Sequence, residues 1–239
     1  MSSAKTVYLI RHGRTTLQAE KRYQGITDAP LSAEGRAELT RAKIRPARVY
    51  VSPLCRARET ASILFPQADQ IVVPDLHEMD FGAFEGRNYM EMENDPDYRA
   101  WVDGLCLGPC PGGESRDQYC DRVCRAFGKV LSLAEKEGDD PVVIVAHGGT
   151  QMALLDRLGR TERTGDDENP GPDTKPDDTK PDTETPDAKT DSGAGENSFS
   201  YYSWQLPSGH GYLLETQPAG PGDLPDLRIL EKQDFTKAE

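Results

Sequence analysis

Polar side chains able to do chemistry follow three hydrophobic runs of the sequence, at the point where each run ends. The runs are TVYLI (6–10), RVYV (48–51) and PVVIVA (141–146), and their β-branched and aromatic composition is typical of strands. The side chains at or just beyond their ends include Arg11, His12, Arg56 and His147. Open α/β sheets bind ligands beyond the carboxyl ends of their strands, so we expect these side chains to meet at one edge of a sheet.

A carboxylate can join them from a fourth run, QIVV (70–73), which leads into LHEMDFGAFEG with Glu78, Asp80 and Glu85. Arginines supply paired donors to a phosphate, a neutral imidazole can attack phosphorus, and a carboxylic acid can protonate the departing oxygen. Two arginines, two histidines and one carboxylate are therefore the groups that phosphoryl transfer needs.

The elements that must position these groups alternate along the chain, which predicts an α/β fold. Ser32 can cap a helix through SAEGRAELTRAK, and a second helix follows SPLCRARETASILF. A third, with one apolar stripe, spans about 116–136, and a fourth follows HGGTQMALLDRL. Near the end of the chain FSYYSWQL and GYLLETQ flank PSGHG, which predicts a terminal hairpin.

Charge is unevenly distributed along the chain. Eleven acidic and three basic residues give 166–196 a net charge of −8, out of −13 for the whole sequence. This segment has no Leu, Ile, Val, Met or aromatic residue, so it cannot bury enough apolar surface to offset the entropy lost on ordering. We interpret it as a disordered acidic insert, a solvated spacer within a single domain spanning 1–239. A functional acidic arm is the alternative.

Composition argues against several classes of protein. The 239 residues are 36% hydrophobic, which is enough for one sizeable core. The longest aliphatic run, VVIVA, is far short of the roughly 18 residues of a membrane span, and MSSAKTVYLI lacks the form of a secretory signal. The body has no basic stripe suited to nucleic acid. We therefore predict a cytoplasmic protein that binds neither membranes nor nucleic acid.

Six blocks of the sequence, in order and at similar spacings, resemble the histidine phosphatase superfamily, also called phosphoglycerate-mutase-like. The blocks are LIRHGRT, YQGITDAPLSAEG, SPLCRARETA, EMDFGAFEG, PGGES and VAHGG. The sequence is most similar to the small-molecule phosphatase branch, including α-ribazole phosphatase-like proteins, because PGGES precedes a long amphipathic helix. The resemblance implies a three-layer α/β sandwich with a mostly parallel central sheet and helices on both faces.

The resemblance also implies a role for each candidate residue. His12 would be the nucleophile that forms a phosphohistidine, and Glu78 would be the proton donor. Arg56 is chosen over Arg58 because it stands directly before the alanine of the family's RA pair. The residues expected to hold the phosphate are Arg11, Thr15, Gln18, Gln24, Gly25, Arg56, His147 and Gly148.

These features predict a phosphomonoesterase that hydrolyses a small phosphorylated metabolite and needs no metal or other cofactor. One alternative is a cofactor-dependent phosphoglycerate mutase, although the segment that such mutases use is not evident between Gly86 and Gly112. Another is a non-catalytic phospho-ligand-binding regulatory protein. Arg14 stands where the family often has glutamate, so it either alters substrate choice or lies at the surface.

The cysteines allow a second, unrelated hypothesis. Five is an odd number in a chain large enough to fold without disulfides, so we expect reduced thiols. The pairs Cys106/Cys110 and Cys120/Cys124 repeat a spacing that a structural zinc site could use. Since the second pair falls on the apolar stripe of the third helix, we favour packing in the core.

Overall fold

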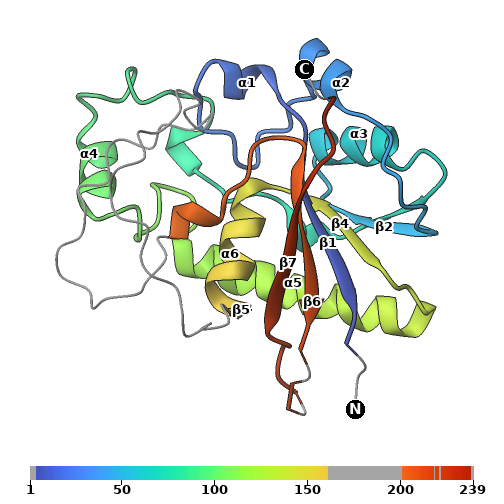
Figure 1. The fold of residues 1–239 in the computed structure, drawn as a ribbon. Helices are drawn as coiled ribbons and strands as arrows, with labels where there is room; N and C mark the ends of the chain where they lie inside the picture. Colours follow the sequence, from blue (N-terminus) through green and yellow to red (C-terminus); the bar gives the residue numbers. More distant parts are fainter. Residues whose placement is uncertain (1–3, 161–200, 218, 221, 238–239) are drawn as a thin grey trace, which may run out of the picture.

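One seven-stranded sheet forms the centre of the computed structural model, which describes residues 4–160, 201–217, 219–220 and 222–237 (Figure 1). The predicted acidic insert at 166–196 lies outside these residues. The strands are β1 (Thr6–Arg11), β2 (Arg48–Val51), β3 (Asp69–Val72), β4 (Val142–Ala146), β5 (Gly159–Arg160), β6 (His210–Thr216) and β7 (Leu227–Asp234). They lie in the order β3-β2-β4-β1-β6-β7-β5.

The four strands that carry the candidate residues run parallel. β4 pairs with β1 from Val142 opposite Val7 to Ala146 opposite Arg11, and β2 pairs with both β4 and β3. β6 joins β1 in antiparallel orientation, and β7 joins β6 in the same way. Because β1, β2 and β4 point the same way, their carboxyl ends meet at one edge of the sheet. The predicted α/β fold with a mostly parallel sheet is confirmed.

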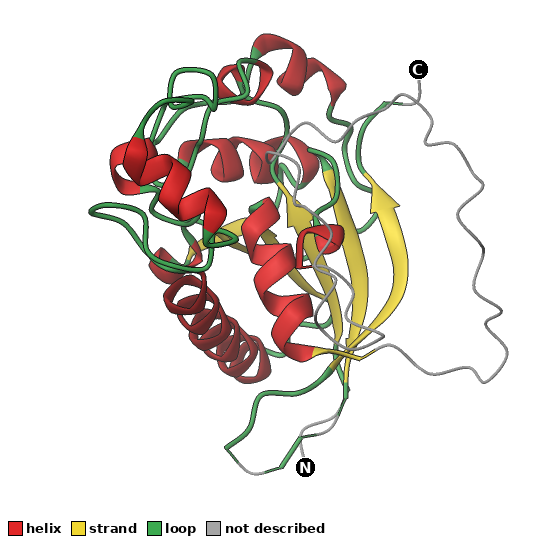
Figure 2. Cartoon of the chain, turned by 90° about the vertical axis from the view of Figure 1, so that its left-hand side faces the viewer, coloured by secondary structure: helices red, strands yellow, loops and turns green. Residues whose placement is uncertain are grey.

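Helices cover both faces of this sheet (Figure 2). The helix α3 (Cys55–Leu64) packs with Val143 and Val145 on one face, whereas α5 (Arg116–Glu137) and α6 (Gly148–Leu158) pack with Val142 and Ile144 on the other. Successive residues of a strand point to opposite faces, and both faces here are buried. This explains why β4 is hydrophobic without interruption, and it confirms the three-layer sandwich.

The shorter helices carry or connect the segments around the site. They are α1 (Thr16–Ala19), α2 (Ala33–Glu38), α4 (Pro96–Asp103) and the 3₁₀ turns η1 (Pro74–Leu76), η2 (Gly82–Phe84) and η3 (Tyr201–Trp204). Ser32 caps α2 as predicted, accepting from the Gly35 N–H at 2.9 Å. This helix is shorter than predicted, because Leu39 turns to extended backbone and bridges to Thr236.

The terminal hairpin differs from its prediction. We expected FSYYSWQL to be one of its strands, but in the described part 201–204 form η3, and the hairpin consists of β6 and β7. The Tyr212 hydroxyl donates to the carbonyl of Trp204 at 2.8 Å, which fixes η3 beside the sheet. The aromatic side chains of η3 pack against the helix layer instead of alternating across a sheet.

The long helix α5 has the capping that its sequence predicts. Ser115 and Gln118 form a reciprocal capping box at its start, and Gly138, with φ of 73°, ends it in the left-handed conformation that favours glycine. Among the described helices, none combines the length and apolarity that crossing a bilayer requires.

Candidate functional site

The carboxyl ends of β1 and β4 bring the two histidines together. The backbone N–H of His12 donates to the carbonyl of Ala146 at 3.0 Å, so the pairing of β1 with β4 continues to the first residue beyond β1. The ring centroids of His12 and His147 are 5.2 Å apart in an edge-on arrangement. Both rings are buried, with 4% and 0% of their residues' surfaces exposed. The predicted meeting of the two strand ends thus occurs, and it buries most of the surface of both rings.

His12 is held in a single useful tautomer. Its Nδ1 lies 2.7 Å from the carbonyl oxygen of Gly13, which can only accept, so Nδ1 carries the proton and Nε2 keeps its lone pair. Burial, reinforced by the charges of Arg56 and Arg11, lowers the pKa of His12 well below its usual value. A neutral, oriented imidazole is the form that can attack phosphorus.

Stability should depend on pH through these histidines. Burial, reinforced by the charge of Arg56, also lowers the pKa of His147. Both histidines therefore bind protons near pH 6.5 in the unfolded chain but stay neutral at that pH in the folded protein. For this reason the free energy of unfolding should fall as pH decreases below about 6.5. Each histidine contributes up to about 1.4 kcal/mol per pH unit.

Urea unfolding from about pH 5 to 7 measures the slope of the free energy of unfolding against pH. We expect His147→Asn to reduce it by one proton; an unchanged slope would contradict a neutral His147.

Arg56 is a buried charge close enough to His12 and His147 to lower the pKa of both. Its Nη1 donates to the carbonyl of Thr27 at 2.9 Å and its Nη2 to the carbonyl of Gly25 at 2.7 Å, and the residue is fully buried. Its Nε has no hydrogen-bond partner among the described residues. Burial lowers the pKa of Arg56, yet a guanidinium keeps its proton in proteins. Arg58, the alternative position, is exposed.

Arg11 flanks the nucleophile from β1. Its Nη1 donates to the carbonyl of Leu206 at 2.6 Å, and only 5% of the residue is exposed. The segment that precedes β6 therefore orients this guanidinium. Arg11 and Arg56 together place two fixed positive charges beside His12.

Glu78 faces the site from the loop after η1, with its carboxylate held at both oxygens. Oε1 accepts from the Met79 N–H at 3.0 Å, and Oε2 accepts from the Gly149 N–H at 3.1 Å, in the first turn of α6. A Cβ at position 149 would lie 2.2 Å from Oε1 and 2.7 Å from the Tyr119 hydroxyl. Only glycine leaves room there for the acid. Arg122, which stacks on the Tyr119 ring, fixes the backbone by donating to the Glu78 carbonyl at 3.3 Å.

The predicted phosphate ligands in and around α1 form a linked set. The Thr15 hydroxyl donates to Gln24 Oε1 at 2.6 Å, and the Thr15 N–H donates to Gln18 Oε1 at 3.0 Å. Gln18 Nε2 in turn donates to Ser208 at 3.2 Å, whereas Gln24 Nε2 is buried without a hydrogen-bond partner among the described residues. Thr15 thus orients the two amides, and Gln24 lines the cleft with an unused donor.

The two predicted glycines have different surroundings. We expected the backbone of Gly25 to donate to phosphate, but its N–H donates to Glu85 at 3.2 Å while its carbonyl holds Arg56. A Cβ on Gly25 would lie 1.8 Å from the carbonyl oxygen of Met79, so tight packing explains this glycine. Gly148 lines the cleft at the start of α6, where a Cβ would collide with the amide of Gln205.

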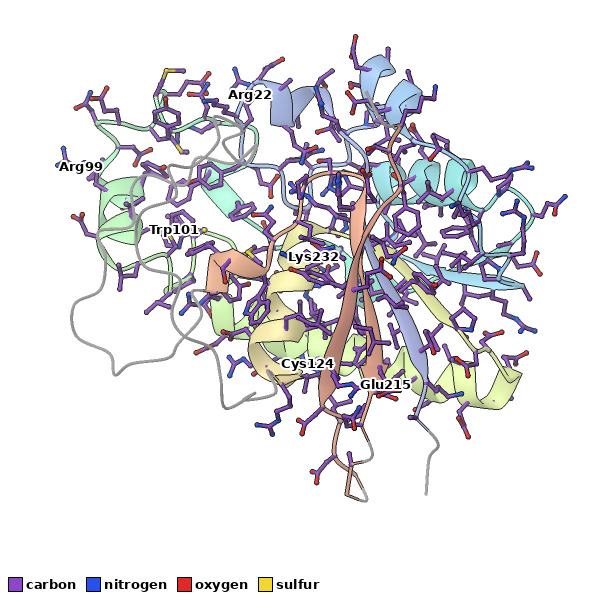
Figure 3. All side chains as sticks on the ribbon, in the orientation of Figure 1. Arg22, Arg99, Trp101, Cys124, Glu215 and Lys232 are labelled. Atoms are coloured by element: carbon purple, nitrogen blue, oxygen red, sulfur yellow. The ribbon has the colours of Figure 1, made fainter. Side chains whose placement is uncertain are left out.

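A cleft of about 1140 Å³, including solvent at its mouth, opens over Arg11, His12 and Glu78. Arg56 and His147 lie behind its surface. Trp101 lines this cleft from α4, and Figure 3 labels it beside that helix. The sequence did not predict the aromatic walls, because their members lie far apart in the chain: Tyr23, Phe81, Tyr89, Trp101, Tyr201 and Tyr202.

Of the remaining candidates, only Cys106 lines the cleft in the part of the chain that the structure describes. Arg14 pairs with Glu38 at 2.9 Å on the surface and does not line the cleft. The five cysteines are free thiols; Cys110 and Cys120 are buried in the core and Cys106 lines the cleft. No group of three or more His, Cys, Asp and Glu side chains suited to a metal occurs among the described residues. We retain core packing as the role of Cys120.

A family model of the histidine phosphatase superfamily (branch 1) matches residues 7–170, which include every candidate catalytic residue. The chain belongs to this superfamily. A protein of Arabidopsis thaliana described as a metal-independent phosphoserine phosphatase is 33% identical over 176 residues, covering 69% of this chain and 73% of that protein. A probable phosphoglycerate mutase of Escherichia fergusonii is 35% identical over 151 residues, covering 59% and 69%.

Solved structures of histidine phosphatases share the fold. A putative α-ribazole-5′-P phosphatase from Escherichia coli aligns with a TM-score of 0.67 at 21% identity, covering 99% of this chain and all of that one. A phosphoglycerate mutase from Thermus thermophilus aligns with a TM-score of 0.59 at 26% identity, covering 95% and 98%. The predicted membership of the superfamily is confirmed.

Proposed function

We propose that this histidine phosphatase hydrolyses a small phosphorylated metabolite through a phosphohistidine at His12. The observation that carries the proposal is the contact between His12 Nδ1 and the Gly13 carbonyl: it engages the ring proton, so Nε2 keeps a lone pair, and burial with the charges of Arg56 and Arg11 keeps that ring neutral. Membership of the superfamily, with a phosphatase among the relatives, supports the same reaction.

The geometry supports a two-step mechanism. In the first step Nε2 of His12 attacks phosphorus, the bond to the leaving oxygen breaks, and Glu78 gives that oxygen a proton. In the second step water attacks the phosphohistidine, Glu78 takes up the proton of the water, and phosphate leaves. Arg11, Arg56 and His147 stabilise the charge on the phosphoryl oxygens in both steps, because they are fixed before the reaction begins.

The walls of the cleft favour a leaving group with apolar surface. Tyr23 stacks edge-on against Phe81 and Trp101, with ring centroids 5.2 and 5.8 Å away, and Tyr201 and Tyr202 line the cleft from η3. Rings bind between such walls more strongly than small zwitterions do. We therefore rank ring-bearing phosphates above phosphoserine and phosphoglycerate, the substrates in the relatives' names. The location in the cytoplasm and the absence of nucleic-acid partners stay predictions.

A screen of phosphorylated metabolites for release of inorganic phosphate tests the function. The panel pairs alkyl phosphates with ring-bearing phosphates whose leaving groups have similar basicity, and it includes phosphoserine and 3-phosphoglycerate. Release of phosphate at physiological substrate concentrations supports a phosphatase. Interconversion of phosphoglycerates without release would instead identify a mutase, and binding without turnover would identify a regulatory protein.

Chelation should leave the rate nearly unchanged. The guanidinium groups of Arg11 and Arg56 occupy the role that Mg²⁺ has in metal-dependent phosphatases, neutralising the phosphoryl oxygens. The measurement compares kcat before and after dialysis against a chelator, and again after Mg²⁺, Mn²⁺ or Zn²⁺ is restored. A loss of more than about tenfold that one of these metals reverses would contradict a purely organic site.

A further inference from the structure

The two ring nitrogens of His147 have different surroundings. Its Nε2 lies 2.7 Å from the hydroxyl oxygen of Ser52, and its Nδ1 is buried without a hydrogen-bond partner among the described residues. Both residues are fully buried. Ser52 directly follows β2, and its N–H donates to the carbonyl of Val145 at 3.1 Å, so adjacent strand ends fix the pair.

The hydrogen bonds of Ser52 decide which nitrogen of His147 carries the proton. The Ser52 oxygen already accepts from the Leu54 N–H at 3.3 Å. If it also accepted from Nε2–H, its own hydroxyl proton would have no acceptor among the described residues, although Ser52 is fully buried. If instead the hydroxyl donates to Nε2, its proton and one of its lone pairs both have partners. The second arrangement puts the imidazole proton on Nδ1.

A proton on Nδ1 makes this nitrogen a hydrogen-bond donor, which is what an anionic phosphoryl group requires. The ring lies edge-on to the nucleophile, with Arg11 and Arg56 near enough to lower its pKa. In this tautomer the unpaired Nδ1–H is a donor for a phosphoryl oxygen beside His12. In the other tautomer Nδ1 would turn a lone pair toward that oxygen, and the two would repel each other.

We propose that Ser52 is a positioning residue that fixes His147 as the Nδ1–H tautomer, so that a neutral histidine donates a hydrogen bond to the transferred phosphoryl group. The second half rests on the proposed function, whereas control of the tautomer does not. Ser52 does not touch substrate and acts only through His147.

Nitrogen NMR of protein labelled with ¹⁵N-histidine measures the tautomer directly. The sequence has only four histidines, so the signals of His147 can be assigned with one substitution. In the wild type we expect protonated Nδ1 and unprotonated Nε2 for His147. Inorganic phosphate should shift the Nδ1 signal. A wild-type His147 protonated on Nε2 would overturn the proposal, whatever any variant does.

Two variants and a control connect the tautomer to catalysis. Ser52→Ala should mix or reverse the tautomer of His147, leave that of His12 unchanged, and lower kcat/KM about tenfold to a hundredfold. Ser52→Thr retains the hydroxyl and should restore the tautomer and part of the rate. Ser62→Ala is the control, because this exposed serine donates only to the Arg58 carbonyl of its own helix.

The readouts separate the possible failures. If Ser52→Ala loses activity while the tautomer stays, Ser52 has a merely structural role and the proposal is wrong. If the tautomer changes while kcat/KM stays, the donor is unimportant and the proposal is equally wrong. If no phosphate ester is turned over but the tautomer responds as expected, the proposed function fails and the tautomer control stands.

Discussion

The His12→Ala protein should fold normally and lose at least about 10⁴-fold in kcat, because it removes the only atom aimed to attack phosphorus. The Nε2 lone pair belongs to a neutral ring that burial and the charges of Arg56 and Arg11 keep unprotonated, and alanine offers no substitute. Water can in principle attack in its place, but nothing orients that water or removes its proton at the same point. The fold should survive, since the ring makes a single hydrogen bond, to a neighbouring backbone carbonyl.

Rapid quenching provides the positive half of this test. Wild-type protein mixed with ³²P-labelled substrate should yield an acid-labile, base-stable phosphoenzyme, and His12→Ala should yield none. His210→Ala is the matched control, because His210 does not line the cleft. A folded His12→Ala protein with undiminished turnover would refute the mechanism.

Glu78→Gln should cost on the order of 10² to 10⁴ in kcat for alkyl phosphates and much less for nitrophenyl phosphate. An alkoxide leaves poorly unless it is protonated, whereas nitrophenolate is a stable anion. Glutamine keeps the size of the side chain and one oxygen that can accept from Met79 or Gly149, but its NH₂ group cannot accept from the other N–H. The part of the loss that reports the missing proton is therefore the part that depends on the leaving group.

The ratio between the two substrates is therefore the measurement that matters. Equal losses on both would indicate that Glu78 only positions other groups. Glu93→Gln, at an exposed position, should change neither rate. Gly149→Ala tests the same acid from the other side, because a Cβ there would displace the carboxylate while leaving its charge. We expect it to reproduce the selective loss on alkyl phosphates.

The sequence predicted the sheet because its signal is local. An uninterrupted VVIVA can be stable only where both faces of a strand are covered, and β4 is such a strand. The catalytic set was predicted for a related reason: parallel strands bring their ends to one edge, whatever lies between them. His12 and His147 are 135 positions apart, yet neighbouring strands place their rings in contact.

The features that the sequence did not predict depend on contacts between residues far apart in the chain, which no local sequence pattern indicates. The N–H of Gly25 is not available to a phosphate because it donates to the carboxylate of Glu85, which lies on a loop distant in the sequence. The aromatic residues of η3 have the composition of a strand. They nevertheless form a 3₁₀ turn, in which Tyr201 and Trp204 pack partly buried against the core. The bond between Ser52 and His147 likewise exists only once β2 and β4 pair.

The hydrogen bonds of Arg56 have a consequence for how the enzyme responds to its surroundings. Among the described residues they go to two backbone carbonyls and to no carboxylate, so this buried charge attracts free orthophosphate as well as substrate. We expect the product to compete for the site in proportion to its concentration. Hydrolysis would then slow when phosphate is plentiful and quicken when it is scarce, so that this buried guanidinium would link the rate of the reaction to the concentration of the nutrient that it releases.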